Sequence, residues 1–355
     1  MRRRAAPRLR AVCRHTSPPA APPAAAASIR PHPRIHRLPP QERDGDAESR
    51  AIQQREFPDE AYVAPEEETP GDVKWFCLEP AARCYAGGID CRSGAAELDL
   101  VEAVAQGVYR DGFALLQGII DVGWVDECAE AFAPRLAAHV EGLRASGTKP
   151  NRGPERHSMP LDIERPFVEL LEHQQLQRLL TRLLGPDPAL TFLSSDTVLG
   201  GGGSVYQNVH LDGGIDAVGP FDAAAEGELA EPEGLGSGHV VLNFSLVDVG
   251  ERRGPLEISA GSHRYPLPAA HQRILDGTAP LERLLMRKGD LLVRDLRTLH
   301  RGSPNLSSVD RPNVTLIVAA DGPEGAGGKP GMSSVRPGAL EGLGPTARRM
   351  LRAFS

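Results

Sequence analysis

From residue 189 onward, the chain carries its apolar residues in short runs separated by Gly and Pro. No helix of the length that a parallel crossover needs is recognisable between successive runs, so an antiparallel arrangement is favoured over repeated βαβ units. Many short strands joined by turns are typical of a double-sheet jelly roll of the cupin kind. The strands predicted for this core, about residues 189–320, are 189–199, 239–249, 255–258, 281–286, 290–295 and 312–319.

Helical periodicity comes before this core. Apolar side chains recur every three or four positions in residues 97–109, and Asp121 is a good cap for a helix that reaches about residue 145. A third helix is expected over 166–184, and a first strand over 112–116. The fold class predicted from these patterns is mainly β with flanking helices.

The N-terminal part differs in composition from the rest. Residues 1–70 are rich in Pro, Arg and Glu without hydrophobic periodicity, so we expect a largely disordered extension before one domain over 71–355. Residues 1–41 hold nine arginines and no acidic residue, which is the composition of an organelle transit peptide, although the repeated prolines argue against an amphipathic helix. A plain disordered extension, or a start assigned too far upstream, is the alternative. We expect an intracellular protein, in the cytoplasm or in an organelle.

Charge and hydropathy exclude two classes of partner. Beyond residue 41 the chain has 31 basic and 47 acidic side chains, which disfavours nucleic-acid binding by phosphate neutralisation. No apolar run reaches the length of about 18 residues that a membrane span needs. The cysteines do not have the short paired spacing of a zinc site, and we expect reduced thiols at Cys13, Cys77, Cys84, Cys91 and Cys128.

The chemistry is indicated by His210-Leu211-Asp212 and the distant His300. A spacing of two puts His210 and Asp212 on one side of a strand. Two imidazoles and one carboxylate can fill one face of an octahedral Fe(II) site and leave the other face to a cosubstrate and O₂. Arg311 follows eleven residues after His300, where a guanidinium can bind a carboxylate through two hydrogen bonds. A lone His-X-Asp is a weak motif, however, and a histidine on a strand is more often structural.

Two longer segments resemble the phytanoyl-CoA dioxygenase-like family of Fe(II)/2-oxoglutarate oxygenases. Residues 254–264 are similar to the family's NGPL…PGSH signature, with Arg253 in place of Asn and Ala260 in place of Pro. Residues 288–305, continued to Arg311-Pro312, are similar to its distal-histidine block. The resemblance covers about residues 100–320. It implies a double-stranded β-helix core and Fe(II), 2-oxoglutarate and O₂ as cofactors, with iron ligands His210, Asp212 and His300 and a 2-oxoglutarate-binding Arg311.

The resemblance extends less directly to other positions. Asn243, Thr197 and Ser303 are candidate 2-oxoglutarate contacts, and their alternative role is an ordinary hydrogen bond within the sheet. His263 is expected to support a loop near the site rather than to bind metal.

Several polar segments are interpreted as exposed. Arg156 and His157 can line a substrate entrance, but a solvated loop is the expectation, and His239 is expected to be exposed. Residues 213–238, with six carboxylates, are predicted to form a long mobile loop beside the metal site. The glycine clusters at 200–203 and 325–329 do not meet the requirements of a phosphate-binding loop.

The expected function is hydroxylation of an unactivated C–H bond in a small molecule, either acyl-CoA-like, amino-acid-derived or a secondary metabolite. Related halogenases have a small residue where this chain has Asp212, and chloride takes that ligand position. Two alternatives remain open, a hydroxylase of protein or peptide side chains and a catalytically inactive cupin-like binding protein. The sequence indicates neither the substrate nor the oligomeric state.

Overall fold

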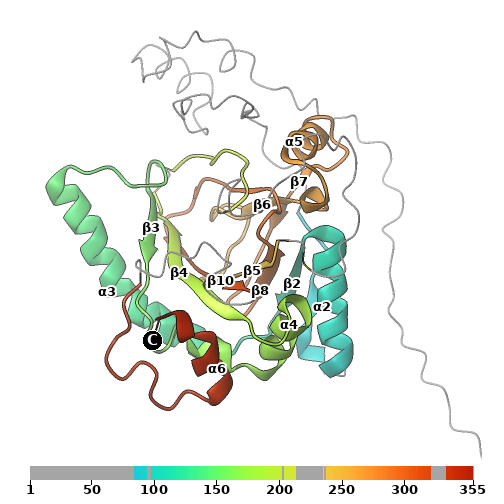
Figure 1. Cartoon of the computed structure of the whole chain (residues 1–355). Helices are drawn as coiled ribbons and strands as arrows, with labels where there is room; N and C mark the ends of the chain where they lie inside the picture. Colours follow the sequence, from blue (N-terminus) through green and yellow to red (C-terminus); the bar gives the residue numbers. More distant parts are fainter. Residues whose placement is uncertain are drawn as a thin grey trace, which may run out of the picture.

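The computed structural model describes residues 84–93, 97–201, 204–212, 235, 237–320 and 333–354. Within these residues two β-sheets face each other, and helices cover the outside of the larger one (Figure 1). The larger sheet has seven strands, in the order β1 (Ile89–Asp90), β2 (Phe113–Gln117), β8 (Leu291–Asp295), β5 (His239–Ser245), β10 (Arg311–Ala319), β4 (Ala189–Val198) and β3 (Arg156–Pro160). The smaller sheet has the order β7 (Leu281–Leu284), β6 (Leu256–Ser259) and β9 (His300–Gly302).

The helices come mostly from the first half of the chain. The α-helices are α2 (Glu97–Asp111), α3 (Val122–Ser146), α4 (Gln174–Leu184), α5 (Leu267–Leu275) and α6 (Pro345–Met350). Short 3₁₀ helices span Cys91–Ser93, Glu169–Glu172, Ser262–Arg264 and Arg352–Phe354. None of the helices in the described ranges is long and apolar enough to cross a membrane.

Alternation along the strands divides the large sheet into two chemically different faces. The outer face carries side chains such as Leu242, Val293 and Leu316, which pack against the helices in the main hydrophobic core. The inner face carries Asn243, Arg294 and Thr315, which line a cavity between the two sheets. The main hydrophobic core therefore lies between the large sheet and the helices, and the inner face of that sheet carries polar side chains toward the cavity.

The predicted fold class is confirmed, a mainly β jelly roll with flanking helices. Apart from β1, each strand pairing in the two sheets is antiparallel, and the six strands predicted for the core are present within a few residues of their expected ends. Asp121 caps α3 by accepting a hydrogen bond from the backbone N–H of Trp124 at 3.0 Å, as expected.

The prediction of one helix over 166–184 is wrong. His173 has an extended backbone (φ −66°, ψ 114°) and its ring Nδ1 accepts from the N–H of Leu176, so α4 begins only at Gln174. The N-terminal extension 1–70, the glycine cluster 325–329 and nearly all of the loop 213–238 lie outside the described residues.

Candidate metal centre and its cavity

The two candidate histidine ligands lie on neighbouring backbone segments that pair with each other. The N–H of His210 donates to the carbonyl of His300 and the N–H of His300 donates back, both at 2.9 Å. Directly opposed residues of an antiparallel pair point to the same side, and the two ring centroids lie 4.5 Å apart. Residues 90 positions apart in the chain are thus held side by side by the backbone.

Each imidazole has one nitrogen engaged and one available. Nδ1 of His210 lies 2.7 Å from the carbonyl oxygen of Asn208, and Nδ1 of His300 lies 2.9 Å from that of Thr298. Because a carbonyl oxygen only accepts, Nδ1 carries the proton in both rings and Nε2 keeps its lone pair. Burial lowers the pKa of both histidines, so they are neutral at pH 7.

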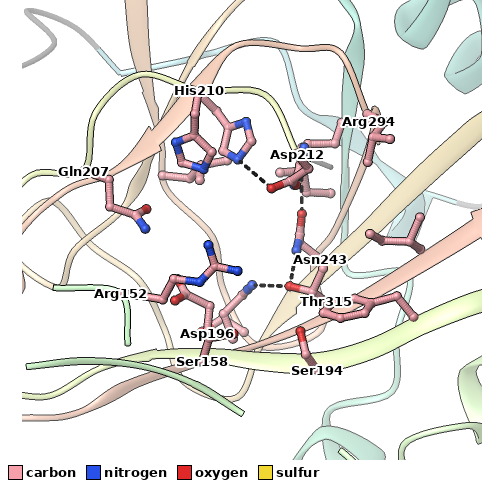
Figure 2. A pocket seen from close by; sticks show the side chains of 18 of the residues that line it. Arg152, Ser158, Ser194, Asp196, Gln207, His210, Asp212, Asn243, Arg294 and Thr315 are labelled. Atoms are coloured by element: carbon pink, nitrogen blue, oxygen red, sulfur yellow. Dashed lines mark hydrogen bonds and ion pairs between the residues drawn. The ribbon is translucent and has the colours of Figure 1, made fainter. Parts of the chain in front are cut away.

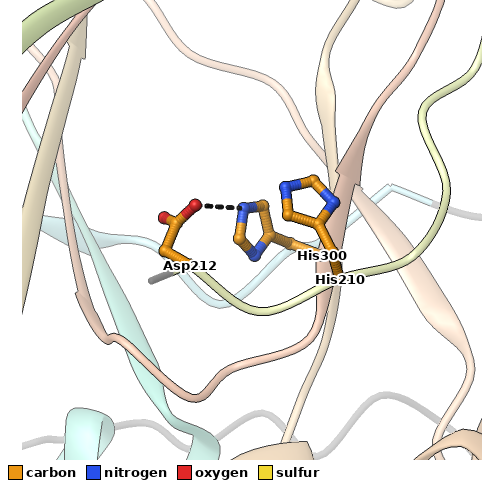
Figure 3. Close-up of side chains that lie close together, drawn as sticks. All are labelled: His210, Asp212 and His300. Atoms are coloured by element: carbon orange, nitrogen blue, oxygen red, sulfur yellow. Dashed lines mark ion pairs between the residues drawn. The ribbon is translucent and has the colours of Figure 1, made fainter. Parts of the chain in front are cut away.

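Asp212 completes the cluster (Figure 3). Its Oδ1 lies 3.8 Å from Nε2 of His300, and one ligand atom from each of the three side chains lies within 4.8 Å of the others. Burial raises the pKa of this carboxyl, but the charge and hydrogen bond of Arg294 outweigh it, so the pKa lies well below its ordinary value. Two neutral nitrogen donors and one anionic oxygen are a fitting donor set for Fe(II).

Arg294 and Asn243 form a second layer around Asp212 that the sequence did not reveal. Arg294 is paired with Oδ2 of Asp212, and its Nε donates to Oδ1 of Asn243 at 3.1 Å. The amide of Asn243 donates in turn to the hydroxyl of Thr315 at 2.8 Å. This chain of contacts leaves Oδ1 of Asp212 facing the histidines. The sequence does contain one indication of this support, which is the single arginine, Arg294, at the end of the apolar run of strand β8.

Arg311, at the start of β10, lines the same cavity as the three candidate ligands. Its Nη1 donates to the carbonyl of Asp196 at 3.4 Å and its Nη2 lies 3.9 Å from the carboxylate of the same residue. Among the described residues its buried Nε has no hydrogen-bond partner. Burial lowers the pKa of Arg311 to about 10, against the opposing effect of Asp196, so the guanidinium is charged at pH 7. A buried cation with unused donor capacity fits the distal carboxylate of 2-oxoglutarate.

The cavity has a volume of about 610 Å³ and opens between the two sheets (Figure 2). One part of its wall is apolar and includes Val249, Leu256, Leu284 and Met286. Another part is polar and includes Ser158, Ser194 and Asp196 from β3 and β4. Asn243 lies in this wall, so its role as a 2-oxoglutarate contact stays a prediction.

Thr197 and Ser303, by contrast, do not belong to the cavity wall. Thr197 follows Asp196 on β4, and alternation directs it to the other face of the sheet, where it is fully buried. The buried hydroxyl of Ser303 donates to the carbonyl of Pro255 at 2.6 Å. The structure therefore gives no support to either residue as a cosubstrate contact.

Among the remaining candidates, His263 lies outside the metal cluster, as expected. Arg156, His157 and His239, which were expected to be exposed, are buried. His263 is buried outside the metal cluster, and its Nε2 lies 3.1 Å from the carbonyl oxygen of Tyr109. The solvated loop expected at Arg156 and His157 is wrong, because both are buried on β3 and Arg156 pairs with Asp196 at 3.0 Å. His239 is buried at the start of β5 rather than exposed.

Comparison with family models gives one match, to the family described as phytanoyl-CoA dioxygenase (PhyH), over residues 108–313, which is more than half of the chain. A comparison with curated proteins gives no match.

Solved structures with a similar fold include the non-heme alpha ketoglutarate dependent epimerase SnoN from nogalamycin biosynthesis, 22% identical over 63% of this chain and 84% of that one, with a TM-score of 0.47. AviO1 from Streptomyces viridochromogenes Tue57 is 20% identical over 62% and 95%, with a TM-score of 0.45. HygX from Streptomyces hygroscopicus, solved with nickel and 2-oxoglutarate bound, is 16% identical over 62% and 87%, with a TM-score of 0.46. At these TM-scores the three structures do not bear on the function of this chain.

Proposed function

Because the chain belongs to the phytanoyl-CoA dioxygenase family, we propose that it is an Fe(II)- and 2-oxoglutarate-dependent dioxygenase that hydroxylates an unactivated C–H bond of a small molecule. The observation that carries this proposal is the convergence of His210, Asp212 and His300 in one cavity with the buried Arg311. An inactive cupin-like protein has no need of both a donor cluster and a cation suited to a keto acid.

The residues of the chain have separate roles in this proposal. His210 and His300 offer Nε2, and Asp212 offers Oδ1, to the iron. Arg294 and Asn243 hold the Asp212 carboxylate in its orientation. When bound, iron and 2-oxoglutarate together with O₂ supply the oxidation of a C–H bond, coupled to decarboxylation of 2-oxoglutarate to succinate.

Arg311 anchors the cosubstrate by its distal carboxylate. The guanidinium is held by Asp196, from the neighbouring strand β4, so it does not have to be ordered when the carboxylate arrives. Burial strengthens the attraction because little water competes for the charge.

Two features favour hydroxylation of a small molecule. Asp212 places a carboxylate where related halogenases leave the ligand position to chloride. The cavity volume of about 610 Å³ is within the usual range for sites that enclose a small ligand. A hydroxylase of protein side chains has no specific support in the described residues.

The test uses purified protein loaded with Fe(II) under anaerobic conditions. We expect it to bind 2-oxoglutarate only in the presence of metal, and to release succinate slowly when O₂ is admitted, even without a substrate. Asp212→Ala is expected to lose both properties. Failure of the metal-loaded protein to bind 2-oxoglutarate would favour the inactive binding protein, whereas success opens a screen of metabolites for faster succinate release.

A further inference from the structure

A short loop before β3 carries Arg152 to the cavity, and its backbone is firmly held. The side chain of Asn151 accepts from the N–H of Ser158 and donates to the carbonyl of Ser158, both at 2.9 Å. The N–H of Arg156 donates to the carbonyl of Gly153 at 3.2 Å. These bonds tie both ends of the turn to β3, so the position of Arg152 is set before any ligand binds.

Arg152 is an exposed cation that points into the cavity, toward the metal centre (Figure 2). Arg152 lines the same cavity as His210 and Asp212. No ion pair or hydrogen bond links it to another described residue.

Gln207 lies beside Arg152 and offers donors to the same space (Figure 2). Its Oε1 accepts a hydrogen bond from the N–H of Gly302 at 3.0 Å, and its own N–H donates to the carbonyl of Gly302 at 3.0 Å. Because an N–H must meet the amide oxygen, the amide nitrogen of Gln207 is the end that faces the cavity. Arg152 and Gln207 together form a wall patch with donors only.

The other charges that line the cavity are already paired. Asp212 is matched by Arg294, and Asp196 is shared by Arg311 and the buried Arg156. Among the described charged residues that line the cavity, only Arg152 has no carboxylate paired with it. We propose that Arg152 and Gln207 form an anion subsite that binds a carboxylate or phosphate group of the substrate, which makes the substrate an acid or a phosphate ester. This inference rests on the proposed function.

An anion at this position has two possible sources, the substrate and the cosubstrate itself. 2-Oxoglutarate already has Arg311 for its distal carboxylate and the metal for its other end, so it leaves Arg152 unmatched. The substrate is the remaining source. If the anion belongs to the substrate, a change at Arg152 reduces the affinity for a phosphate probe. If it belongs to the cosubstrate, the same change reduces the affinity for 2-oxoglutarate, and the test measures both affinities.

The experiment measures binding of inorganic phosphate by isothermal titration calorimetry, with metal-free protein and with protein loaded with Ni(II) and 2-oxoglutarate. Arg152→Gln is expected to weaken phosphate binding about tenfold in both forms, since a charge-assisted hydrogen bond is lost. Arg152→Lys should keep part of the affinity. Arg348→Gln, a change at an exposed arginine on α6 far from the cavity, is the matched control and should behave as wild type. The affinity of the Ni(II) protein for 2-oxoglutarate should change less than about twofold in Arg152→Gln. A change of that size is smaller than the loss of one hydrogen bond would cause.

The subsite is overturned if wild type does not bind phosphate, or if Arg152→Gln binds it as tightly as wild type does. A tenfold loss of 2-oxoglutarate affinity in Arg152→Gln would instead assign the subsite to the cosubstrate and overturn the substrate assignment. Failure of the wild-type Ni(II) protein to bind 2-oxoglutarate at all would count against the proposed function, and the metal-free titrations would still decide whether the anion subsite exists.

Discussion

The guanidinium of Arg294 is paired with Oδ2 of Asp212, the carboxylate that we propose as a metal ligand. Arg294 is only 3% exposed and belongs to β8, whereas Asp212 lies at the end of the segment that pairs with β9. An ion pair between the large sheet and the segment that carries His210 thus sets which oxygen of Asp212 faces the histidines. A ligand held from behind in this way binds metal more tightly than one that is free to rotate.

Replacing Arg294 by Met keeps an unbranched chain where the aliphatic part of the arginine lies, and removes the guanidinium that supports Asp212. We expect the affinity for Fe(II), or for Ni(II) as a stable substitute, to fall by about 10- to 100-fold. Arg297→Met is the matched control, because it removes an arginine paired with Asp295, a carboxylate outside the metal cluster. Equal metal affinities for Arg294→Met and wild type would remove Arg294 from this role.

Each of the three candidate ligands should be needed for metal binding. His210→Ala, Asp212→Ala and His300→Ala are expected to reduce bound metal to background and to abolish succinate formation, since two ligands hold Fe(II) poorly. His263→Ala, a change at a buried histidine outside the cluster, should keep one metal per chain when it folds. Metal content after gel filtration measures binding, and circular dichroism checks that each variant is folded. If a variant kept its full metal content and activity, the residue replaced in it would not be a metal ligand.

Arg311 should determine the cosubstrate requirement rather than metal binding. Arg311→Ala is expected to raise the dissociation constant for 2-oxoglutarate at least about tenfold, because a buried charge-assisted bond is lost. Arg311→Lys should recover little, since a single ammonium cannot bind a carboxylate through two parallel bonds. Equilibrium dialysis with the Ni(II) protein measures the constant, and an unchanged value would require another residue for the carboxylate.

The strands of the core, and the placement of His210 and Asp212 on one side of the chain, were predictable because both depend on local pattern. Apolar runs bounded by Gly and Pro marked the strands of the core. A spacing of two places side chains on one side of an extended segment, and this holds for His210 and Asp212 although His210 forms only an isolated bridge and Asp212 lies in a turn. The position of His300 opposite His210 was accessible only through resemblance to a family, since no local rule pairs residues 90 positions apart.

The predictions failed where a polar side chain is buried because partners distant in the sequence satisfy its hydrogen bonds. The segment around Arg156 has the composition of a loop, but a carboxylate on the adjacent strand and a carbonyl on a distant loop satisfy its guanidinium. Arg294 likewise sits in a buried strand only because Asp212 and Asn243 are there to receive it. Nothing near either arginine in the sequence shows these partners.

His157 should make the free energy of unfolding depend on pH. It is 3% exposed, burial lowers its pKa, and neither ring nitrogen has a hydrogen-bond partner among the described residues. Below pH 6.5 the imidazole of His157 is protonated in the unfolded chain but stays neutral in the folded protein. The free energy of unfolding therefore falls as the pH falls. The slope from one such histidine is at most about 1.4 kcal/mol per pH unit.

The measurement compares urea unfolding of wild type and His157→Phe, both free of metal, between pH 7 and pH 5. His157→Phe is expected to lose less stability over this range. Parallel curves for the two proteins would mean that His157 is protonated equally in the folded and unfolded states.

Gly302 should tolerate no side chain, because the guanidinium of Arg156 packs against its Cα. A Cβ added there would lie 2.5 Å from Nη1 of Arg156. That guanidinium holds Asp196 and the carbonyl of Ser303 together, so its displacement would disturb a buried ion pair as well as the packing. We expect Gly302→Ala to lower the free energy of unfolding by about 1–3 kcal/mol, measured by urea denaturation. Gly250→Ala is the matched control, since nothing lies within 4 Å of a Cβ at that position. If the two variants were equally stable, the contact between β9 and Arg156 would not be the tight one that the structure shows.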